Sequence, residues 1–325
     1  IAVVLGNAFV LKPSEKVPMT ANRLGQLMME AGFPPGVFSV VHGGREAVEA
    51  LVTHDDVAAV AFVGSTPIAR KLYQLGTSRG KRVLALGGAK NHLIVVPDAD
   101  EQVTVQGVVD SFTGCAGQRC MAASVLVAVG DVDPLLDKIV ARAASIEVGT
   151  GMGAIIDEAS RDRITSAIDA AVAQGAKLVV DGRGKRPADA TYQAGSWLGP
   201  TVLDRVSPDM EIRHTEVFGP VLTVVRVPTL KDAIALQHQS AFGNAASVFT
   251  TNGAVAQYVA ENAHAGMIGV NVGVPVPREP FSFGGTQESK FGQGDITGHS
   301  GVEFWSTVKK ITRKWQAQPD TTWMG

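Results

Sequence analysis

The chain has 325 residues and a mass of 34.0 kDa, enough for one large globular unit or two ordinary domains. Apolar residues make up 45% of it and charged residues 18%, so we expect a sizeable core and exclude a disordered chain. Its 29 Lys and Arg nearly balance its 31 Asp and Glu, which argues against a general nucleic-acid or acidic-membrane binder.

The hydrophobic pattern alternates between strands and helices from the first residue. Ile1 to Leu5 is strand-like, with no starting Met, so the chain is expected to open in the middle of a fold. The run 57–63 is apolar throughout, which is typical of a strand buried on both faces. In this part of the chain, strands are predicted at 7–12, 37–41, 57–63 and 82–86, and helices at 18–31, 45–52 and 66–76.

A second series of elements begins after Gly87-Gly88, where we place a domain boundary. The alternation in both series predicts an α/β fold with parallel sheets and helical crossovers. Residues 307–313 alternate apolar and polar side chains, as a half-exposed strand does. In the second series, strands are predicted at 92–96, 123–129, 176–181, 220–227, 245–250 and 267–272, and helices at 101–112, 133–147 and 158–174.

Cys120 is the first candidate for chemistry. Glycines at 114 and 117 permit the backbone before it to turn toward a cleft, and Arg119 beside it would favour a nucleophilic thiolate. A buried, inert cysteine is the alternative for Cys120, and it is the preferred interpretation of Cys115. No metal site is expected, because the two cysteines lack further ligands at suitable spacing.

Two strand ends could hold a nucleotide. Glu15 could accept hydrogen bonds from ribose hydroxyls and would repel a 2′-phosphate, which favours NAD over NADP, while Lys12 lies three residues before it. Ser65 follows Gly64 at a helix start, where backbone amides could hold a pyrophosphate. Each signal also fits an ordinary helix start with solvated side chains, and the G-x-G-x-x-G fingerprint does not occur.

Glu216 and Phe218 precede a further apolar strand, and taken alone they fit a turn with a packed Phe. Together and in order, these segments resemble the aldehyde dehydrogenase superfamily. The resemblance rests on Lys12-Pro-Ser-Glu15, Phe62-Val-Gly-Ser65, Gly87-Gly88, Gly117-Gln-Arg-Cys120, Glu216-Val-Phe-Gly-Pro220 and Phe283-Gly-Gly285. Finer features resemble the CoA-acylating methylmalonate/malonate-semialdehyde dehydrogenases, in Gly88-Ala-Lys-Asn-His92, Gly117-Gln-Arg-Cys-Met-Ala122, Val248-Phe-Thr-Thr-Asn-Gly253 and Gly269-Val-Asn-Val272.

The resemblance implies a division of the chain. Residues 1–88 would be the remainder of a Rossmann-type NAD-binding domain, and residues 89–300 a second α/β domain carrying the nucleophilic Cys. Residues 301–325 would form a tail with an oligomerisation strand, and relatives are usually tetramers built from dimers. The family's oxyanion-hole Asn lies just upstream of Ile1, so a fragment of a longer enzyme is expected.

The resemblance also assigns roles. Cys120 would attack the aldehyde carbon to form a thiohemiacetal, its own N–H would help to hold the oxyanion, and hydride would pass to NAD. Arg119 would bind the carboxylate of the substrate, which suits its two-pronged donor. For the cofactor, Lys12 and Glu15 would bind the adenosine ribose, Ser65 the pyrophosphate, Glu216 the nicotinamide ribose and Phe218 the nicotinamide end.

One departure from the superfamily is informative. Hydrolytic aldehyde dehydrogenases carry a Glu before Leu-Gly-Gly, where this chain has Ala85. Because alanine cannot take a proton from water, the acyl group would pass to the thiol of CoA, giving propionyl-CoA or acetyl-CoA with loss of carbon dioxide. A hydrolytic enzyme that recruits another base and a catalytically impaired fragment remain the alternatives.

The implied partners are therefore a small semialdehyde, NAD, CoA as co-substrate and further copies of the chain, with no nucleic acid and no membrane. No apolar run approaches the roughly 18 residues of a membrane span, and the N-terminus lacks the features of a signal peptide. Two cysteines cannot staple a chain of this length. We therefore expect a cytoplasmic setting.

Overall fold

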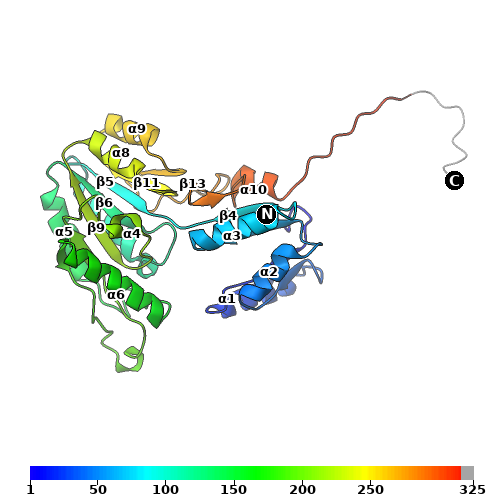
Figure 1. Ribbon diagram of the computed structural model, residues 1–325, viewed down its shortest axis with the longest axis horizontal. Coiled ribbons are helices and arrows are strands. Elements are labelled where there is room, and N and C mark those ends of the chain that lie inside the picture. The colour runs from blue at the N-terminus through cyan, green and yellow to red at the C-terminus, as the bar shows by residue number, and fades with distance from the viewer. Residues whose placement is uncertain (316–325) are drawn as a thin grey trace, which may run out of the picture.

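The computed structural model describes residues 1–315, and most elements lie where the sequence predicts them (Figure 1). The helices are α1 (Pro18–Glu30), α2 (Arg45–Thr53), α3 (Thr66–Thr77), α4 (Glu101–Thr113), α5 (Asp133–Ala144), α6 (Glu158–Ala173), α7 (Glu211–His214), α8 (Leu230–His238), α9 (Gly253–Asn262) and α10 (Gly298–Phe304), with 3₁₀ turns η1 (Gly114–Gly117) and η2 (Ala190–Tyr192). The strands are β1 (Phe9–Leu11), β2 (Phe38–Val40), β3 (Ala59–Val63), β4 (Arg82–Leu86), β5 (Asn91–Val95), β6 (Ala123–Val129), β7 (Lys177–Val180), β8 (Thr201–Asp204), β9 (Val221–Val227), β10 (Phe242–Gly243), β11 (Ala245–Phe249), β12 (Met267–Val270), β13 (Thr286–Gln287) and β14 (Lys290–Phe291).

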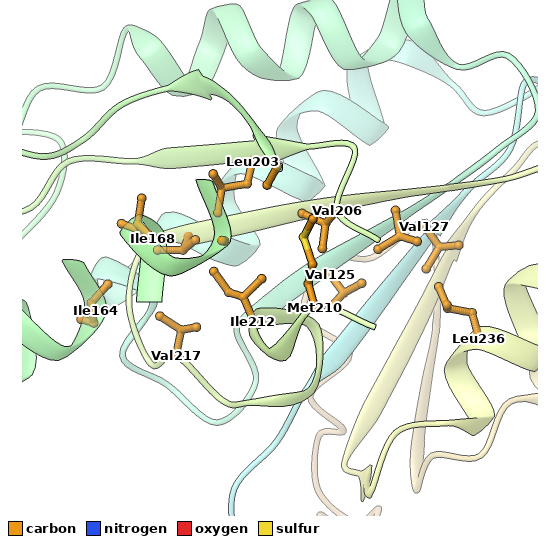
Figure 2. Packing of buried hydrophobic residues seen from close by; sticks show 14 of the residues in the cluster. Val125, Val127, Ile164, Ile168, Leu203, Val206, Met210, Ile212, Val217 and Leu236 are labelled. Carbon is orange, nitrogen blue, oxygen red and sulfur yellow. The ribbon is translucent and has the colours of Figure 1, made fainter. Parts of the chain in front are cut away.

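A seven-stranded sheet forms the larger part, in the order β12-β11-β5-β6-β9-β8-β7. Its neighbouring strands are parallel except β7 and β8, which are antiparallel. Helices cover both faces (Figure 1). In β6, Val125 and Val127 pack in the cluster with α6, α8 and α9, while Leu126 and Ala128 pack in the cluster with α4 and α5. The alternation arises because successive strand side chains point to opposite faces, and Figure 2 shows the first cluster.

The N-terminal part holds two small sheets. In one, β1 and β2 pair in parallel, and in the other β4 lies between β3 and β14. Strand β14 comes from far along the chain and pairs antiparallel with β4. Phe304 of α10 also packs on Leu84 and Leu86 of β4. These contacts return residues 290–304 to the first unit, and the division at Gly88 stays a prediction.

Two predicted strands in the N-terminal part differ from the structure. Ile1 to Leu5 forms turns, because Leu5 N–H donates to the Ile1 carbonyl at 3.1 Å and Gly6 N–H donates to the Val3 carbonyl at 3.0 Å. These local bonds replace pairing with another strand. Strand β3 is not buried on both faces, and Val63 is 58% exposed. Its apolar run instead lies at the edge of the three-stranded sheet.

The predicted strand at 307–313 is also absent from the described chain. Those residues have no strand partner within residues 1–315, and Val308 and Ile311 are 86% and 63% exposed. An alternating pattern alone does not make a strand, because a strand needs a neighbour to satisfy its backbone groups. The oligomerisation role of the tail stays a prediction, and residues 316–325 of that tail lie outside the described part.

The sequence pattern did not predict the helices α7 to α10 or the short strands β8, β10, β13 and β14. Across residues 1–315, none of the helices has the length and apolar character needed to cross a membrane.

Two basic side chains are buried at the start of β5. Lys90 and His92 are 2% and 1% exposed, and neither the Lys90 Nζ nor a His92 ring nitrogen has a hydrogen-bond partner among residues 1–315. Burial lowers the pKa of Lys90 to about 7, although the nearby carboxylate of Glu216 opposes that shift. Burial likewise lowers the pKa of His92 to about 3. The fold therefore favours the neutral forms of both groups.

Replacing Lys90 should change how stability depends on pH. Between its pKa of about 7 in the fold and roughly 10.4 in the unfolded chain, only the unfolded chain binds the extra proton. The free energy of unfolding therefore rises with pH there, by up to about 1.4 kcal/mol per pH unit from this group. We expect Lys90→Met to be more stable than the parent chain near pH 7.5, with the difference shrinking toward pH 10.

Urea unfolding at pH 7.5, 8.5 and 9.5 measures this difference. Lys138→Met is the matched control, because Lys138 is half-exposed and keeps water around its ammonium group in both states. A difference between Lys90→Met and the parent that stays constant across the three pH values would contradict the expectation.

Candidate active site

Cys120 lies in the link between η1 and β6, after a tight turn of the backbone. Cys115 and Ala116 both have φ of 52° and Gly117 has φ of 68°, so three successive residues are left-handed. A Cβ at Gly117 would lie 2.1 Å from the Gly219 carbonyl oxygen. Only glycine therefore lets this loop lie against the segment that follows Glu216, which brings two distant parts of the sequence together.

The same turn overturns one expectation. Cys115 is exposed, whereas its preferred interpretation was a buried cysteine. Its left-handed backbone lies at the surface-facing start of η1, while the next two residues, Ala116 and Gly117, are buried. Cys120 is partly buried, so the structure distinguishes the two thiols by their access to water.

Burial is the largest influence on the Cys120 thiol, and it raises the pKa of that thiol. The carboxylate of Glu216 raises it further. The backbone N–H groups of Cys120 and Met121 act against that shift, and the guanidinium of Arg119 lowers the pKa by a smaller amount. Arg119 thus lowers the pKa of the Cys120 thiol, as the sequence predicts, but burial raises that pKa by more.

Arg119 lies over the end of α4. Its Nη2 donates to the carbonyl oxygens of Asp110 and Ser111 at 2.6 and 3.1 Å in the last turn of α4, where the Asp110 carbonyl also accepts from the Gly114 N–H. A Cβ at Gly114 would lie 2.4 Å from that nitrogen, so the glycine makes room for the guanidinium. These bonds fix one edge of Arg119 on the main chain, and binding of a substrate carboxylate stays a prediction.

Glu216 reaches the turn after β4. Its Oε1 accepts from the Ala89 N–H at 3.0 Å, and a Cβ at Gly88 would lie 2.4 Å from Oε2. Burial raises the pKa of Glu216, and the Ala89 N–H and the charge of Lys90 oppose that rise. Gly88 is itself held by Thr66, whose Oγ1 accepts from the Gly88 N–H at 2.8 Å. The carboxylate therefore lies against the end of β4 and the start of α3.

Phe218 is presented outward and is not packed in a turn. It has φ of 55° and is 40% exposed, while the preceding Val217 is buried. The Val217 carbonyl accepts from Arg163 Nη1 at 2.7 Å, which ties the segment to α6. Glu216, Phe218 and Arg119 line one small pocket. The structure thus brings together these three predicted site residues.

Lys12, Glu15 and Ser65 lie in the N-terminal part. The Lys12 Nζ donates to the Gly43 carbonyl at 2.7 Å and lies 3.6 Å from Glu15 Oε2. A backbone hydrogen bond, followed by the charge of Lys12, lowers the pKa of Glu15. Ser65 is exposed at the N-cap of α3, beside the Thr66 that holds Gly88. Lys12 and Glu15 therefore form one pair, and Ser65 adjoins the Glu216 region.

Several residues that shape the site were not singled out from the sequence. Ser289 donates through Oγ to the Gly88 carbonyl at 2.7 Å, and Asn91 and Asn244 bind the Cys120 carbonyl. Asn91 lies within Gly88-Ala-Lys-Asn-His92, so that motif already marked its position. Asn244 and Ser289 stand alone in loops that carry no comparable signal.

Known proteins resemble this chain along almost all of its length. It is 46% identical over 322 residues to malonate-semialdehyde dehydrogenase 1 of Oceanobacillus iheyensis, covering 97% of this chain and 66% of that protein. It is 45% identical over 323 residues to the malonate-semialdehyde dehydrogenase of Pseudomonas aeruginosa, covering 97% and 65%. The chain therefore spans slightly less than two thirds of the length of these relatives.

Solved structures agree. The methylmalonate-semialdehyde dehydrogenase of Oceanimonas doudoroffii superposes with a TM-score of 0.94 at 43% identity, covering 98% of this chain and 66% of that one. A structure of a Sinorhizobium meliloti protein complexed with NAD has a TM-score of 0.95 at 44% identity, with the same coverage. The family model for aldehyde dehydrogenases matches residues 1–311. This chain belongs to the aldehyde dehydrogenase family.

Proposed function

We propose that this chain supplies the catalytic centre of an NAD-dependent, CoA-acylating dehydrogenase of malonate or methylmalonate semialdehyde. The observation that carries the proposal is the close contact of Gly117 with Gly219, which sets the loop of Cys120 against the segment of Glu216. Relatives 43–46% identical over nearly the whole chain are named as dehydrogenases of these two semialdehydes. Within the proposal, residues 1–88 serve the cofactor, residues 89–300 carry the chemistry and the tail after 300 joins subunits in a tetramer.

The residues present fit NAD. Glu216 Oε1 is held by the Ala89 N–H, and its Oε2 makes no hydrogen bond within residues 1–315, so one carboxylate oxygen is left for a ribose hydroxyl. Lys12 and Glu15 would hold the adenosine ribose, and Ser65 at the exposed start of α3 would meet the pyrophosphate. NAD supplies the acceptor for the hydride that leaves the aldehyde carbon.

Cys120 carries the covalent step. Its thiolate forms the C–S bond to the aldehyde carbon, and loss of hydride from that carbon leaves a thioester on the sulfur. The N–H of Cys120 helps to hold the negative oxygen. Arg119 offers the unused side of its guanidinium to the substrate carboxylate, which later leaves as carbon dioxide while a proton from water takes its place on the α-carbon.

The acyl group then passes to the CoA thiol, and the proton of that thiol returns to the Cys120 sulfur. Support for this acceptor comes from Ala85. Its methyl group is completely buried beside Ala69 and Val83, with Phe62 and Phe291 packed against the same cluster. The position therefore provides no base that could activate water, and a thiol, which ionises far more readily, is the better nucleophile.

Hydrolysis is the second candidate, and Glu216 is the observation in its favour. Its carboxylate acts on the Cys120 thiol electrostatically, and burial raises the pKa of Glu216 toward the range of a general base. In that case Glu216 would accept a proton from water in place of the missing Glu at position 85. Dependence of turnover on CoA separates the two candidates.

Purified chain, NAD and malonate semialdehyde are mixed with and without CoA, while NADH and acyl-CoA are followed together. We expect sustained NADH formation only with CoA, matched mole for mole by acetyl-CoA. Equal turnover without CoA would favour hydrolysis instead. Silence in both mixtures would support the impaired-fragment alternative, and the chain fused to the part of a relative that it does not cover would then be assayed.

Cys120→Ser and Cys115→Ser are the matched pair of controls for this assay. The first should abolish NADH formation, by at least about a thousandfold, because the hydroxyl is a far weaker nucleophile than the thiolate. The second removes the exposed thiol and should leave turnover unchanged. Equal loss in the two variants would contradict the assignment of Cys120.

Glu216→Gln tests the electrostatic part of the site without any cofactor. The carboxylate of Glu216 raises the pKa of Cys120, so removing its charge should increase the thiolate fraction. Glutamine keeps the length and an oxygen for the Ala89 N–H. We expect Cys120 to react with iodoacetamide about two- to fivefold faster at pH 7.5. An unchanged or slower rate would show that the carboxylate does not act on the thiol.

A further inference from the structure

Two buried carboxamides bind the carbonyl oxygen of Cys120. Asn91 Nδ2 donates to that oxygen at 2.8 Å, and Asn244 Nδ2 donates to it at 2.9 Å. Asn91 and Asn244 are 3% and 8% exposed, so both bonds are shielded from water. Both lone-pair directions of one carbonyl are thus occupied by side chains that come from segments more than a hundred residues apart.

A bulge between β5 and β6 places Asn91 in this arrangement. Asn91 pairs with Ala123 of β6, whereas His92 already pairs with Val125, so Ser124 is the extra residue of a bulge. A bulge redirects a side chain at the rim of a sheet. It frees the Asn91 carboxamide to bind the Cys120 and Ala122 carbonyls, while its Oδ1 accepts from a backbone N–H at the start of β11, beside Asn244.

The bound carbonyl belongs to the same peptide unit as the Met121 N–H. In a trans peptide the C=O and the N–H point in opposite directions, so fixing one fixes the other. The Met121 N–H is one of the two backbone groups that lower the pKa of the Cys120 thiol. Asn244 also contacts Met121 directly, with Nδ2 at 3.3 Å from its sulfur. The carboxamides therefore hold this peptide at its carbonyl edge, opposite the edge that carries the Met121 N–H.

We propose that Asn91 and Asn244 are positioning residues, which orient the Cys120–Met121 peptide so that its N–H stabilises the Cys120 thiolate. The inference deepens the proposed function, since it rests on Cys120 as the nucleophile. Donation to the carbonyl also polarises the peptide and strengthens its N–H as a donor. Neither residue touches the reacting atoms, so both act through the backbone.

Two charged groups act on the thiol from neighbouring segments, the carboxylate of Glu216 and the guanidinium of Arg119. The proposal leaves both in place. A change caused by a carboxamide variant should therefore appear as a shift of the pH profile of Cys120 on an otherwise unaltered electrostatic background.

Alkylation of Cys120 by iodoacetamide across pH 6.5–10 tests the proposal without NAD, CoA or substrate. Trypsin cleaves after Arg119, so Cys115 and Cys120 fall on separate peptides, and mass spectrometry follows each thiol in the same sample. Asn244→Leu removes the donor at nearly constant volume. We expect the midpoint of Cys120 alkylation to move upward by about 0.5–1 pH unit, slowing the reaction about three- to tenfold at pH 7.5, with Cys115 unchanged.

Gln237→Leu is the matched control. Gln237 is 2% exposed and its carboxamide binds both backbone groups of His264, in a part of the fold that does not contact Cys120. Gln237→Leu removes as many buried hydrogen bonds as Asn244→Leu does. A general loss of stability would therefore shift the midpoint of Cys120 alkylation in both variants. An unshifted midpoint in Asn244→Leu, or an equal shift in Gln237→Leu, would overturn the proposal.

Asn244→Ala is the second variant, and thermal unfolding identifies the variants that fold. Alanine removes the donor without adding a charge near the thiol, so it should also shift the midpoint upward, and its failure to do so would overturn the proposal if Asn244→Leu does not fold. Alkylation reports only on the thiol, so the two proposals can fail separately. A chain that is inactive with semialdehyde but shows the shift would contradict the proposed function and still support the positioning role of Asn91 and Asn244.

Discussion

The site depends on one close contact between two backbones, that of Gly117 with the peptide of Gly219 and Pro220. No side chain fits there, since a Cβ would lie 2.1 Å from a carbonyl oxygen. The contact holds the loop that carries Cys120 against the segment that carries Glu216, which otherwise lie almost a hundred residues apart. The segments of Cys120 and Glu216 are thereby held together by main chain and not by flexible side chains, as a precise site requires.

The fold was largely predictable from the sequence, because its parallel strands are buried runs of apolar residues between amphipathic helices. Strand β6 has the bounds that its pattern predicts. The pattern failed where an element depends on a distant neighbour. Strand β14 exists only because it pairs with β4 about two hundred residues earlier, and the apolar run of β3 lies at an edge that periodicity cannot distinguish from a buried strand.

The candidate site residues could be named from the sequence, but the residues that support them could not. Cys120, Glu216 and Phe218 stand in motifs whose spacing is specific, so they could be named from the sequence. Asn244 and Ser289 act through single hydrogen bonds to backbone carbonyls, and such bonds leave no pattern in a sequence. The exposure of Cys115 follows from a left-handed turn, whose direction the neighbouring glycines permit but do not determine.

Three ionisable groups of the candidate site influence one another in turn, from Lys90 to Glu216 to Cys120. Its pKa lies near neutrality, so its charge responds to small changes around it, and that charge favours the ionised form of Glu216. The carboxylate in turn raises the pKa of the Cys120 thiol. The backbone N–H groups of Cys120 and Met121 lower the pKa of the thiol without carrying a charge, so they act whichever form Lys90 and Glu216 take. In the proposed mechanism, the orientation of the Cys120–Met121 peptide is therefore what keeps Cys120 reactive while the surrounding charges change.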